Sequence, residues 1–262
     1  MTKHIEYIAT INQKGGTGKT TISANLAYSL ALRGKKTALF DLDPQGHSSM
    51  MFLNEEPSTT VKDLFLNKQD NINDFLYEAY TGQTKIKNLY IIPANIKLAL
   101  VAEQIGSRVH KEKILANHLM KLDNSFDFVI LDCPPNLGVL SINGIYAATK
   151  IFIPTTYGRY ALEGIADLFE VIREVKESFY FDYMIIRNTF DTRNKQTNHF
   201  IDTELEKFKD NLAKTIIRKT ESINQSQINC EPILVFDKKS NGSEDFLKLT
   251  EEVLNIANEK KN

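Results

Sequence analysis

The sequence contains few cysteines. Only Cys133 and Cys230 are present among 262 residues, and they lack C-x-x-C spacing. Two cysteines so far apart offer no disulfide framework and fit a protein of a reducing compartment. We therefore expect both to be packed thiols rather than ligands, in a protein of the cytoplasm.

The sequence also lacks an excess of charge of either sign. Lys and Arg total 32 residues against 33 for Asp and Glu, which gives a formal net charge of -1. A chain this close to neutral has no global positive field that would attract DNA or acidic lipid. Any surface that binds nucleic acid must then be local.

Long hydrophobic runs are missing as well. The N-terminus has no basic stretch followed by a long apolar segment, and no stretch is apolar and long enough to span a bilayer. With 42% hydrophobic and 25% charged residues, the chain can bury one large core. No repeat or linker divides it, so we expect one domain over residues 1–262, neither secreted nor integral to a membrane.

What the sequence does have is a glycine-rich loop after its first apolar run. Residues 5–12 read as a strand, and residues 14–21 (KGGTGKTT) follow directly. The backbone N–H groups of such a loop point at phosphate oxygens, and the helix that it opens adds its positive N-terminal dipole. Lys19 is expected to reach the β- and γ-phosphates of ATP, and Thr20 to bind Mg²⁺. The predicted nucleotide-binding residues of this loop are Lys14, Gly15, Gly16, Thr17, Gly18, Lys19, Thr20 and Thr21.

The loop departs from the ordinary pattern at two positions. Gln13 stands where the pattern has glycine, and Lys14 adds a second lysine. This loop resembles the deviant Walker A signature of the ParA/MinD family of dimerising ATPases. The resemblance implies that Lys14 contacts the phosphates of the partner subunit, so that ATP is sandwiched in a homodimer and Lys14 and Lys19 both assist catalysis. The other interpretation is that Lys14 is a solvated loop charge in a different phosphate-binding protein.

Helical and strand patterns alternate along the rest of the chain. Apolar residues recur at helical spacing after the loop up to Leu32, and Gly34 is expected to end that helix. Residues 54–87 are polar and are expected to be the least regular part, with one helical piece at 61–66. The alternation predicts an α/β fold, a P-loop NTPase with a doubly wound, mostly parallel sheet and helices on both faces. Predicted strands are 37–40, 89–93, 126–132, 151–153, 183–186 and 216–217, and predicted helices are 20–32, 98–105, 113–122, 140–148, 162–176, 200–208 and 245–258.

Three carboxylates follow predicted strands, at the edge where open α/β sheets bind ligands. They are Asp41, Asp43 and Asp132. Asp132 resembles a Walker B aspartate, and residues 41–46 (DLDPQG) resemble the switch motif of the same family. The resemblance implies that Thr20, Asp41 and Asp132 surround Mg²⁺ and that Asp43 is the catalytic residue that handles the attacking water. The alternatives are that Asp132 caps the next helix and that Asp43 opens a turn.

Further segments extend the resemblance over most of the chain. Residues 131–135 (LDCPP), 160–164 (YALEG) and 190–193 (FDTR) resemble the ParA/Soj branch. Members of that branch partition plasmids or chromosomes: they bind DNA nonspecifically on the nucleoid as ATP dimers and are stimulated by a ParB-like centromere-binding protein. The resemblance implies the same function here, in the short form without an N-terminal helix-turn-helix domain. Gly158 and Ser222 depart from the family pattern, which often has an acid and an arginine there.

Basic residues in the C-terminal half are the candidates for a DNA surface. Arg193, Lys195 and Lys219 are predicted to contact the phosphates of double-stranded DNA. The alternative is that each is a solvated surface charge. Arg218, together with Asn188, is assigned instead to the adenine pocket.

Other ATPase classes with related loops are the alternatives to this function. A MinD-like cell-positioning ATPase would end in an amphipathic membrane helix. The last predicted helix instead has an apolar stripe at the spacing of a helix that packs on a sheet, formed by Phe246, Leu249, Val253 and Ile256. A nitrogenase-iron-protein-like reductase would need cysteines that meet across a dimer, and a bacterial tyrosine kinase would carry a tyrosine-rich tail. We therefore expect no membrane association and keep the MinD-like ATPase as the main alternative.

Overall fold

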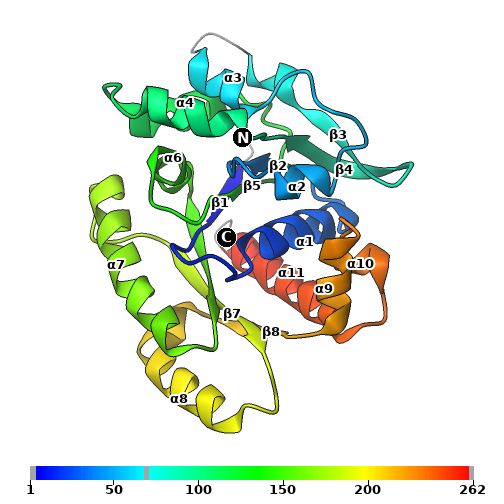
Figure 1. Ribbon diagram of the computed structural model, residues 1–262, viewed down its shortest axis with the longest axis vertical. Helices are drawn as coiled ribbons and strands as arrows, with labels where there is room; N and C mark the ends of the chain where they lie inside the picture. The colour runs from blue at the N-terminus through cyan, green and yellow to red at the C-terminus, as the bar shows by residue number, and fades with distance from the viewer. Residues whose placement is uncertain (1–3, 68–70, 260–262) are drawn as a thin grey trace.

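The computed structural model describes residues 4–67 and 71–259, without the side chains of residues 159–163. Its centre is an eight-stranded sheet with the order β3-β4-β2-β5-β1-β6-β7-β8 (Figure 1). The pair β3–β4 is antiparallel and the other neighbouring pairs are parallel, which confirms the predicted mostly parallel sheet. The strands are β1 (Glu6–Thr10), β2 (Thr37–Asp41), β3 (Tyr77–Thr81), β4 (Thr84–Ile92), β5 (Phe128–Asp132), β6 (Lys150–Thr156), β7 (Tyr183–Phe190) and β8 (Leu212–Arg218).

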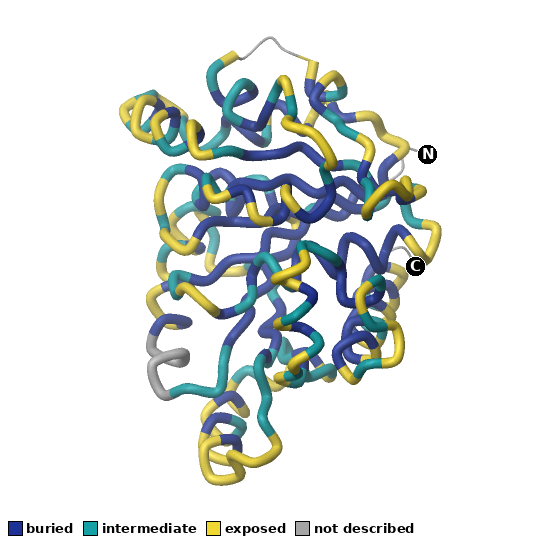
Figure 2. The backbone as a smooth tube through the Cα atoms, turned by 45° about the vertical axis from the view of Figure 1, so that its right-hand side comes forward, coloured by how far each residue is buried: buried dark blue, intermediate teal, exposed yellow. Residues whose placement is uncertain are grey.

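Both faces of the sheet are covered. Phe128 and Ile130 of β5 belong to one hydrophobic core, whereas Val129 and Leu131 belong to the core on the other face. Strands β2 and β5 are buried at every position. Figure 2 shows the buried residues inside the molecule and the exposed residues mainly at its periphery. Burial on both faces explains why the central strands read as nearly continuous apolar runs in the sequence.

The helices form one layer on each face of the sheet. Helices α1, α9, α10 and α11 contribute to one core, and α3 to α8 contribute to the other. This two-layer cover confirms the doubly wound arrangement (Figure 1). The helices are α1 (Lys19–Leu32), α2 (His47–Met50), α3 (Val61–Leu66), α4 (Lys97–Ile105), α5 (Ile114–Leu119), α6 (Val139–Ala147), α7 (Arg159–Lys176), α8 (Lys195–Leu205), α9 (Glu221–Ile228), α10 (Ile233–Phe236) and α11 (Asn241–Glu259). Short 3-10 turns occupy η1 (Ile72–Phe75), η2 (Lys111–Lys113) and η3 (Glu206–Asn211).

Helix α1 ends as the sequence predicts. Gly34 follows it with φ of +77°, a conformation that a residue without a Cβ adopts at little cost. The N–H of Lys35 then donates to the carbonyl of Leu30 at 3.1 Å, which satisfies a carbonyl of the last turn. The cap turns the chain back toward β2, and so β2 runs parallel to β1 with one strand between them.

The prediction that residues 54–87 are the least regular part is wrong. This stretch contains α3, η1, β3 and the first half of β4, and the β3–β4 hairpin extends the sheet beyond β2. The hairpin lies at an edge, and β4 begins with exposed residues Thr84 and Lys85. Strands that face water on one side carry polar residues, so their composition resembles that of a loop.

Several boundaries also differ from the predictions. The helix expected at 200–208 is α8, which starts at Lys195 and ends at Leu205. Strands β7 and β8 are longer than expected because polar residues such as Arg187 and Asn188 continue the pairing of β7 with β6. The short helices α2, α9 and α10 have no clear apolar period, and the sequence does not predict them.

Candidate nucleotide-binding site

Three strands bring the predicted motifs to one edge of the sheet. Strand β5 lies between β1 and β2. Thr10 at the end of β1 pairs with Asp132, and Asp41 at the end of β2 pairs with the same Asp132. The phosphate loop follows β1, so the loop and both carboxylates meet at the carboxyl edge of the sheet. This confirms the shared edge that the sequence predicts.

The phosphate loop is held by its own backbone and by a distant strand. Gly16 and Gly18 have φ of +71° and +90°, which only glycine adopts readily. The Asn188 amide of β7 donates to the carbonyl of Thr17 at 2.8 Å. A Cβ on Gly18 would lie 2.1 Å from the Asn188 Nδ2, so a side chain at position 18 would displace Asn188. Asn188 therefore contacts the loop directly, as expected for a wall of the nucleotide pocket.

Lys19 lies inside the loop that it belongs to. It is 7% exposed, and its Nζ donates to the carbonyl of Lys14 at 3.0 Å. Burial lowers the pKa of Lys19, while the nearby charges of Asp132 and Asp43 oppose that shift. A buried ammonium with few protein partners is well placed for a phosphate oxygen.

Lys14 takes a different direction from Lys19. Its N–H donates to the side chain of Asn12 at 3.0 Å, and its carbonyl accepts from the Thr17 hydroxyl at 3.3 Å. The Lys14 Cε lies 3.6 Å from the position that a Cβ would take at Gly164, so the end of the side chain reaches α7. Lys14 and Lys19 thus leave the same loop toward separate surroundings.

A cavity of about 450 Å³ opens beside the loop. Among the described residues, its wall includes Lys19 but not Lys14, which agrees with their separate directions. Thr17 is buried within the loop and is not one of the residues in the wall. The other predicted nucleotide-binding residues in the wall are Gly15, Gly16, Gly18, Thr20, Thr21, Asn188 and Arg218.

The two predicted Mg²⁺-associated aspartates are buried next to each other. Asp41 and Asp132 have no exposed surface. Burial raises the pKa of both carboxyl groups, and for Asp132 the neighbouring charge of Asp41 raises it further. Two such groups cannot both stay ionised cheaply in a dry interior, so the pair calls for a compensating positive charge.

The free oxygen of Asp132 fits a hydrated divalent cation. Its Oδ1 accepts from the Ser23 hydroxyl at 3.1 Å, whereas its Oδ2 is buried and makes no hydrogen bond with any described residue. Both oxygens of Asp41 accept hydrogen bonds from the protein. Thr20 lies in the cavity wall and carries a hydroxyl oxygen that can serve as a ligand. Mg²⁺ prefers oxygen ligands and keeps several waters, so Thr20 with Asp132 behind it suits Mg²⁺.

Asp43 lines the cavity. It is one of the residues in the cavity wall and is less buried than Asp41 and Asp132. Its N–H donates to the Asp41 Oδ1 at 3.1 Å, and its own Oδ1 accepts from the N–H of Gln45 at 3.0 Å. The carboxylate thus sits in a structured turn in the wall of the cavity. The turn that was the alternative interpretation of Asp43 is present and is compatible with this position.

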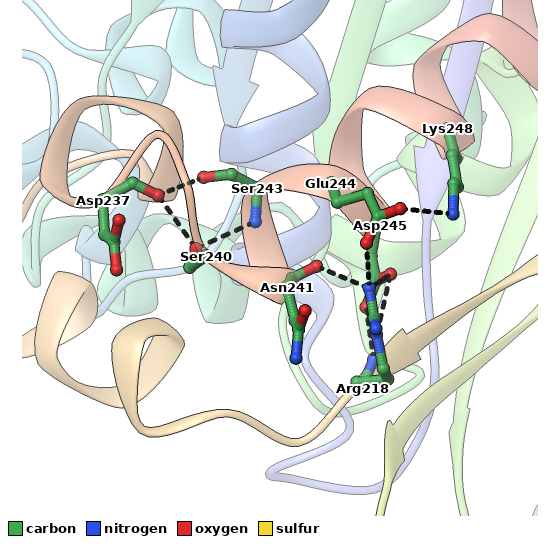
Figure 3. Close-up of polar contacts among 8 residues, drawn as sticks. All are labelled: Arg218, Asp237, Ser240, Asn241, Ser243, Glu244, Asp245 and Lys248. Carbon is green, nitrogen blue, oxygen red and sulfur yellow. Dashed lines mark hydrogen bonds and ion pairs between the residues drawn. The ribbon is translucent and has the colours of Figure 1, made fainter.

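Arg218 lines the cavity with its charge already paired. Its Nε and Nη2 donate to Asp245 at distances of 2.6 to 3.0 Å, and its Nη2 also reaches Glu244 at 2.7 Å (Figure 3). Asp245 also accepts from the backbone N–H of Arg218 at 2.9 Å. These contacts tie the end of β8 to the start of α11. Arg218 and Asn188 lie in the same cavity wall, and the Arg218 charge is paired with carboxylates of α11.

The predicted DNA-binding residues gather at the ends of β7 and β8. The N–H of Lys219 donates to the carbonyl of Phe190 at 2.8 Å, and the charge of Lys219 contributes to the low pKa of Asp191. Arg193 contributes more to that low pKa, since its Nε and Nη2 donate to both oxygens of Asp191. Lys195 begins α8 and is exposed. Lys219 also lines the nucleotide cavity, a position that sequence reasoning did not anticipate.

Sequence reasoning missed residues that support the site from other elements. Ser23 of α1 holds Asp132, and Ser49 of α2 holds Asp41. Helix α9 supplies cavity residues Ile223 and Gln227. The one signal in the sequence was the proximity of Ser23 to the loop and of Ser49 to the DLDPQG motif. The role of α9 depends on tertiary packing.

Cys133 is a packed thiol, as expected. It is buried, burial raises its pKa, and a Cβ on Gly144 would lie 2.5 Å from its Sγ. Cys230 is partly exposed. Among the described residues, no cluster of histidine, cysteine or carboxylate side chains has the arrangement of a metal site built from three or more of them.

The sequence matches a family model described as an AAA domain over residues 5–185. The sporulation initiation inhibitor protein Soj of Bacillus subtilis is 34% identical over 253 residues, which cover 95% of this chain and 98% of that protein. The chromosome-partitioning ATPase Soj of Treponema pallidum is 34% identical over 93% of this chain and 95% of its own length.

The fold is also similar to that of a solved structure. Cobyrinic acid a,c-diamide synthase from Mycobacterium smegmatis, with bound ATP analog and magnesium, superposes with a TM-score of 0.75 at 26% identity. The match covers 96% of this chain and 95% of that one.

Proposed function

Because this chain belongs to the ParA/Soj family of ATPases, we propose that it partitions a plasmid or chromosome. In this proposal an ATP-sandwich homodimer binds double-stranded DNA nonspecifically. A ParB-like centromere-binding protein then stimulates hydrolysis of ATP to ADP and phosphate, and the dimer leaves the DNA. The protein works in the cytoplasm on the nucleoid, and residues 1–262 act as one ATPase domain.

The direction of Lys14 is the observation that carries this proposal. Lys19 lines the cavity of its own subunit, whereas the Lys14 side chain reaches Gly164 of α7. A lysine that serves a partner's phosphates has to leave the loop in another direction than Lys19, and the two side chains differ in this way. Lys14 therefore supports a site completed by a second copy of this chain.

The hydrolytic step is assigned to lysines of the phosphate loop and to Asp43. Phosphoryl transfer needs an attacking water held in line and negative charge neutralised on the γ-phosphate. Lys19 of one subunit and Lys14 of the other supply positive charge, and Asp43 orients the water. Thr20 would hold Mg²⁺ directly and Asp41 and Asp132 would hold its waters. When bound, Mg²⁺ neutralises charge on the β- and γ-phosphates.

DNA binding is assigned to the ends of β7 and β8. Arg193, Lys195 and Lys219 are close in the fold, and the net charge of -1 leaves the rest of the molecule without a general attraction for DNA. Arg193 is already paired with Asp191, so a DNA phosphate has to compete with that carboxylate. A patch this modest gains from dimerisation, because two copies double the number of phosphate contacts.

The buried stripe of α11 argues against the membrane-bound alternative. Phe246, Leu249 and Val253 are buried, and Ile256 packs against the same core. The apolar residues that the alternative would need for lipid are therefore used inside the protein. Within the described residues, no helix combines the length and apolarity needed to cross a membrane.

A mobility-shift assay on a random-sequence duplex tests this function. We expect the protein to retard the duplex with ATP and to leave it unshifted with ADP or without nucleotide. Equal retardation in ATP and ADP would contradict the proposal. Sedimentation with anionic liposomes is the matched test of the alternative: protein that pellets with liposomes only in ATP would favour a MinD-like function.

A further inference from the structure

Ser49 sits where the switch segment meets the end of β4. It belongs to α2 and is 5% exposed. Its N–H and its hydroxyl donate to the same Asp41 oxygen, Oδ2, at 2.9 and 2.6 Å. Its hydroxyl oxygen also accepts from the N–H of Ala94, just past β4, at 2.9 Å. A single hydroxyl thus links two segments that are 45 residues apart.

The other oxygen of Asp41 contacts the turn that carries Asp43. Asp41 Oδ1 accepts from the N–H of Asp43 at 3.1 Å. A continuous hydrogen-bonded path therefore runs from Ala94 through Ser49 and Asp41 to the backbone of Asp43. Hydrogen bonds to a buried charged group are among the stronger ones in a protein, so each step of the path orients the next.

Gly46 packs the same two segments together. It precedes α2 with φ of +66°, and a Cβ there would lie 3.0 Å from the carbonyl of Ala94. Its N–H donates to the carbonyl of Asp43 at 2.9 Å. The turn that carries Asp43 is thus held against the Ala94 backbone at both Gly46 and Ser49.

We propose that Ser49 is a positioning residue for ATP hydrolysis, which acts by fixing Asp41 and, through it, Asp43. The inference rests on the proposed role of Asp43 in orienting water. Without the hydroxyl, Asp41 loses one of its protein donors, and the N–H of Ala94 loses its acceptor in a buried place. The turn then has fewer constraints, and a displacement of about 1 Å at a reacting group can lower a rate on the order of a hundredfold.

Three variants test this role with a built-in control. Ser49→Ala removes the hydroxyl, Ser49→Thr keeps it, and Ser29→Ala makes the same chemical change at a buried helical serine whose hydroxyl makes no hydrogen bond with any described residue. We expect the single-turnover hydrolysis rate of Ser49→Ala to fall at least about tenfold. ATP affinity by calorimetry should stay near the parental value, Ser49→Thr should recover most of the rate, and Ser29→Ala should match the parent.

Hydrogen exchange in nucleotide-free protein gives a readout that does not depend on activity. We expect the amides of Ala94 and Asp43 to exchange faster in Ser49→Ala than in the parent and in Ser49→Thr. If Ser49→Ala does not fold, Ser49→Cys retains a weak donor of similar volume and serves for the same comparison. Parental hydrolysis in the hydroxyl-free variant, or failure of Ser49→Thr to recover the rate, would overturn the proposal.

Failure of the proposed function is distinguishable from failure of this inference. If Asp43→Ala hydrolyses ATP at the parental rate, the role of Asp43 is wrong and the hydrolytic part of the inference falls with it. If Asp43→Ala is inactive but Ser49→Ala hydrolyses normally with unchanged exchange at Ala94, the function stands and Ser49 has no positioning role.

Discussion

A single buried ammonium supplies much of the charge that the cavity offers to a triphosphate. Lys19 is 7% exposed and donates to one backbone carbonyl of its own loop. Lys19→Ala leaves the phosphate loop with its backbone N–H groups and the helix dipole but no side-chain ammonium in the cavity wall, so we expect ATP affinity to fall on the order of a hundredfold. Isothermal calorimetry measures this, with Lys214→Ala at an exposed lysine of β8 as the control. Near-parental affinity in Lys19→Ala would contradict the assignment.

Asp43 differs from the two buried aspartates in what its loss should do. It lies in the cavity wall and is only partly buried, so its removal leaves Asp41, Asp132 and the phosphate loop in place. We expect Asp43→Ala to bind ATP and dimerise while steady-state phosphate release falls at least roughly a hundredfold. The dimer should consequently persist on DNA. Turnover at the parental rate would remove Asp43 from the mechanism.

Some residues of the site can be predicted from the sequence, whereas others are recognised only when the fold is known. The phosphate loop and the aspartates of the DLDPQG segment lie in short contiguous motifs, and their chemistry follows from residue type and local order. Ser23 is different, because its hydroxyl donates to the carboxylate of Asp132, which is 109 residues away in the sequence. The pairing of Arg218 with Asp245 and the position of Lys219 at the cavity likewise depend on how β8 meets its neighbours.

At the scale of elements, prediction succeeds where burial dictates the pattern. Strands β2 and β5 are covered on both faces and read as apolar runs, so the sequence identifies them. The β3–β4 hairpin escapes prediction because its exposed positions are polar. Helix α9 escapes for a related reason, since only Ile223 and Ser226 are buried along it.

The junction of α6 and α7 provides a test by pH. Lys176 at the end of α7 donates to the carbonyls of Tyr146 and Ala148 at the end of α6, and burial lowers its pKa from 10.5 to about 8. Between these values the unfolded chain binds more protons than the folded protein, so stability rises with pH in that window. Below about pH 8 both states are protonated and this contribution is flat.

We therefore expect the parent to gain stability relative to Lys176→Met as the pH rises from 8 to 10.5. The gain should be roughly 1–2 kcal/mol after allowance for solvent screening of a partly exposed group. Urea unfolding of both proteins across this range measures it, with Lys209→Met at an exposed lysine as the control. If the difference in unfolding free energy between the parent and Lys176→Met does not change with pH, then burial does not lower the pKa of Lys176.

At the scale of the whole molecule, near-neutral charge makes DNA binding a local matter. The double variant Arg193→Ala with Lys219→Ala should bind DNA more weakly than the parent, by a similar factor for every DNA sequence. It should also flatten the dependence of log affinity on log salt, by roughly one unit for each DNA phosphate that the variant no longer neutralises. The control pair, Lys209→Ala with Lys214→Ala, makes the same charge change near the start of β8. An unchanged salt slope in the first pair would locate the DNA surface elsewhere.

The sequence predicts the fold of one chain better than it predicts how two chains assemble. The alternation of elements predicts the parallel sheet, and the position of the phosphate loop predicts its functional edge. In the proposed function, whether two copies close over ATP depends on the direction of Lys14, whose Cε approaches Gly164, a residue of α7 that is 150 positions away in the sequence. The sequence could supply that only through its resemblance to a family.

Sedimentation velocity with a fluorescent random-sequence duplex tests the central claim most directly. The parent protein is compared in ATP and in ADP, and Lys14→Ala is compared in ATP. We predict that the parent forms a dimer on the duplex in ATP and remains a monomer off the duplex in ADP. Lys14→Ala should bind ATP and sediment as a monomer apart from the DNA. A Lys14→Ala protein that dimerises on DNA like the parent, or a parent that binds DNA equally in ADP, would contradict the account.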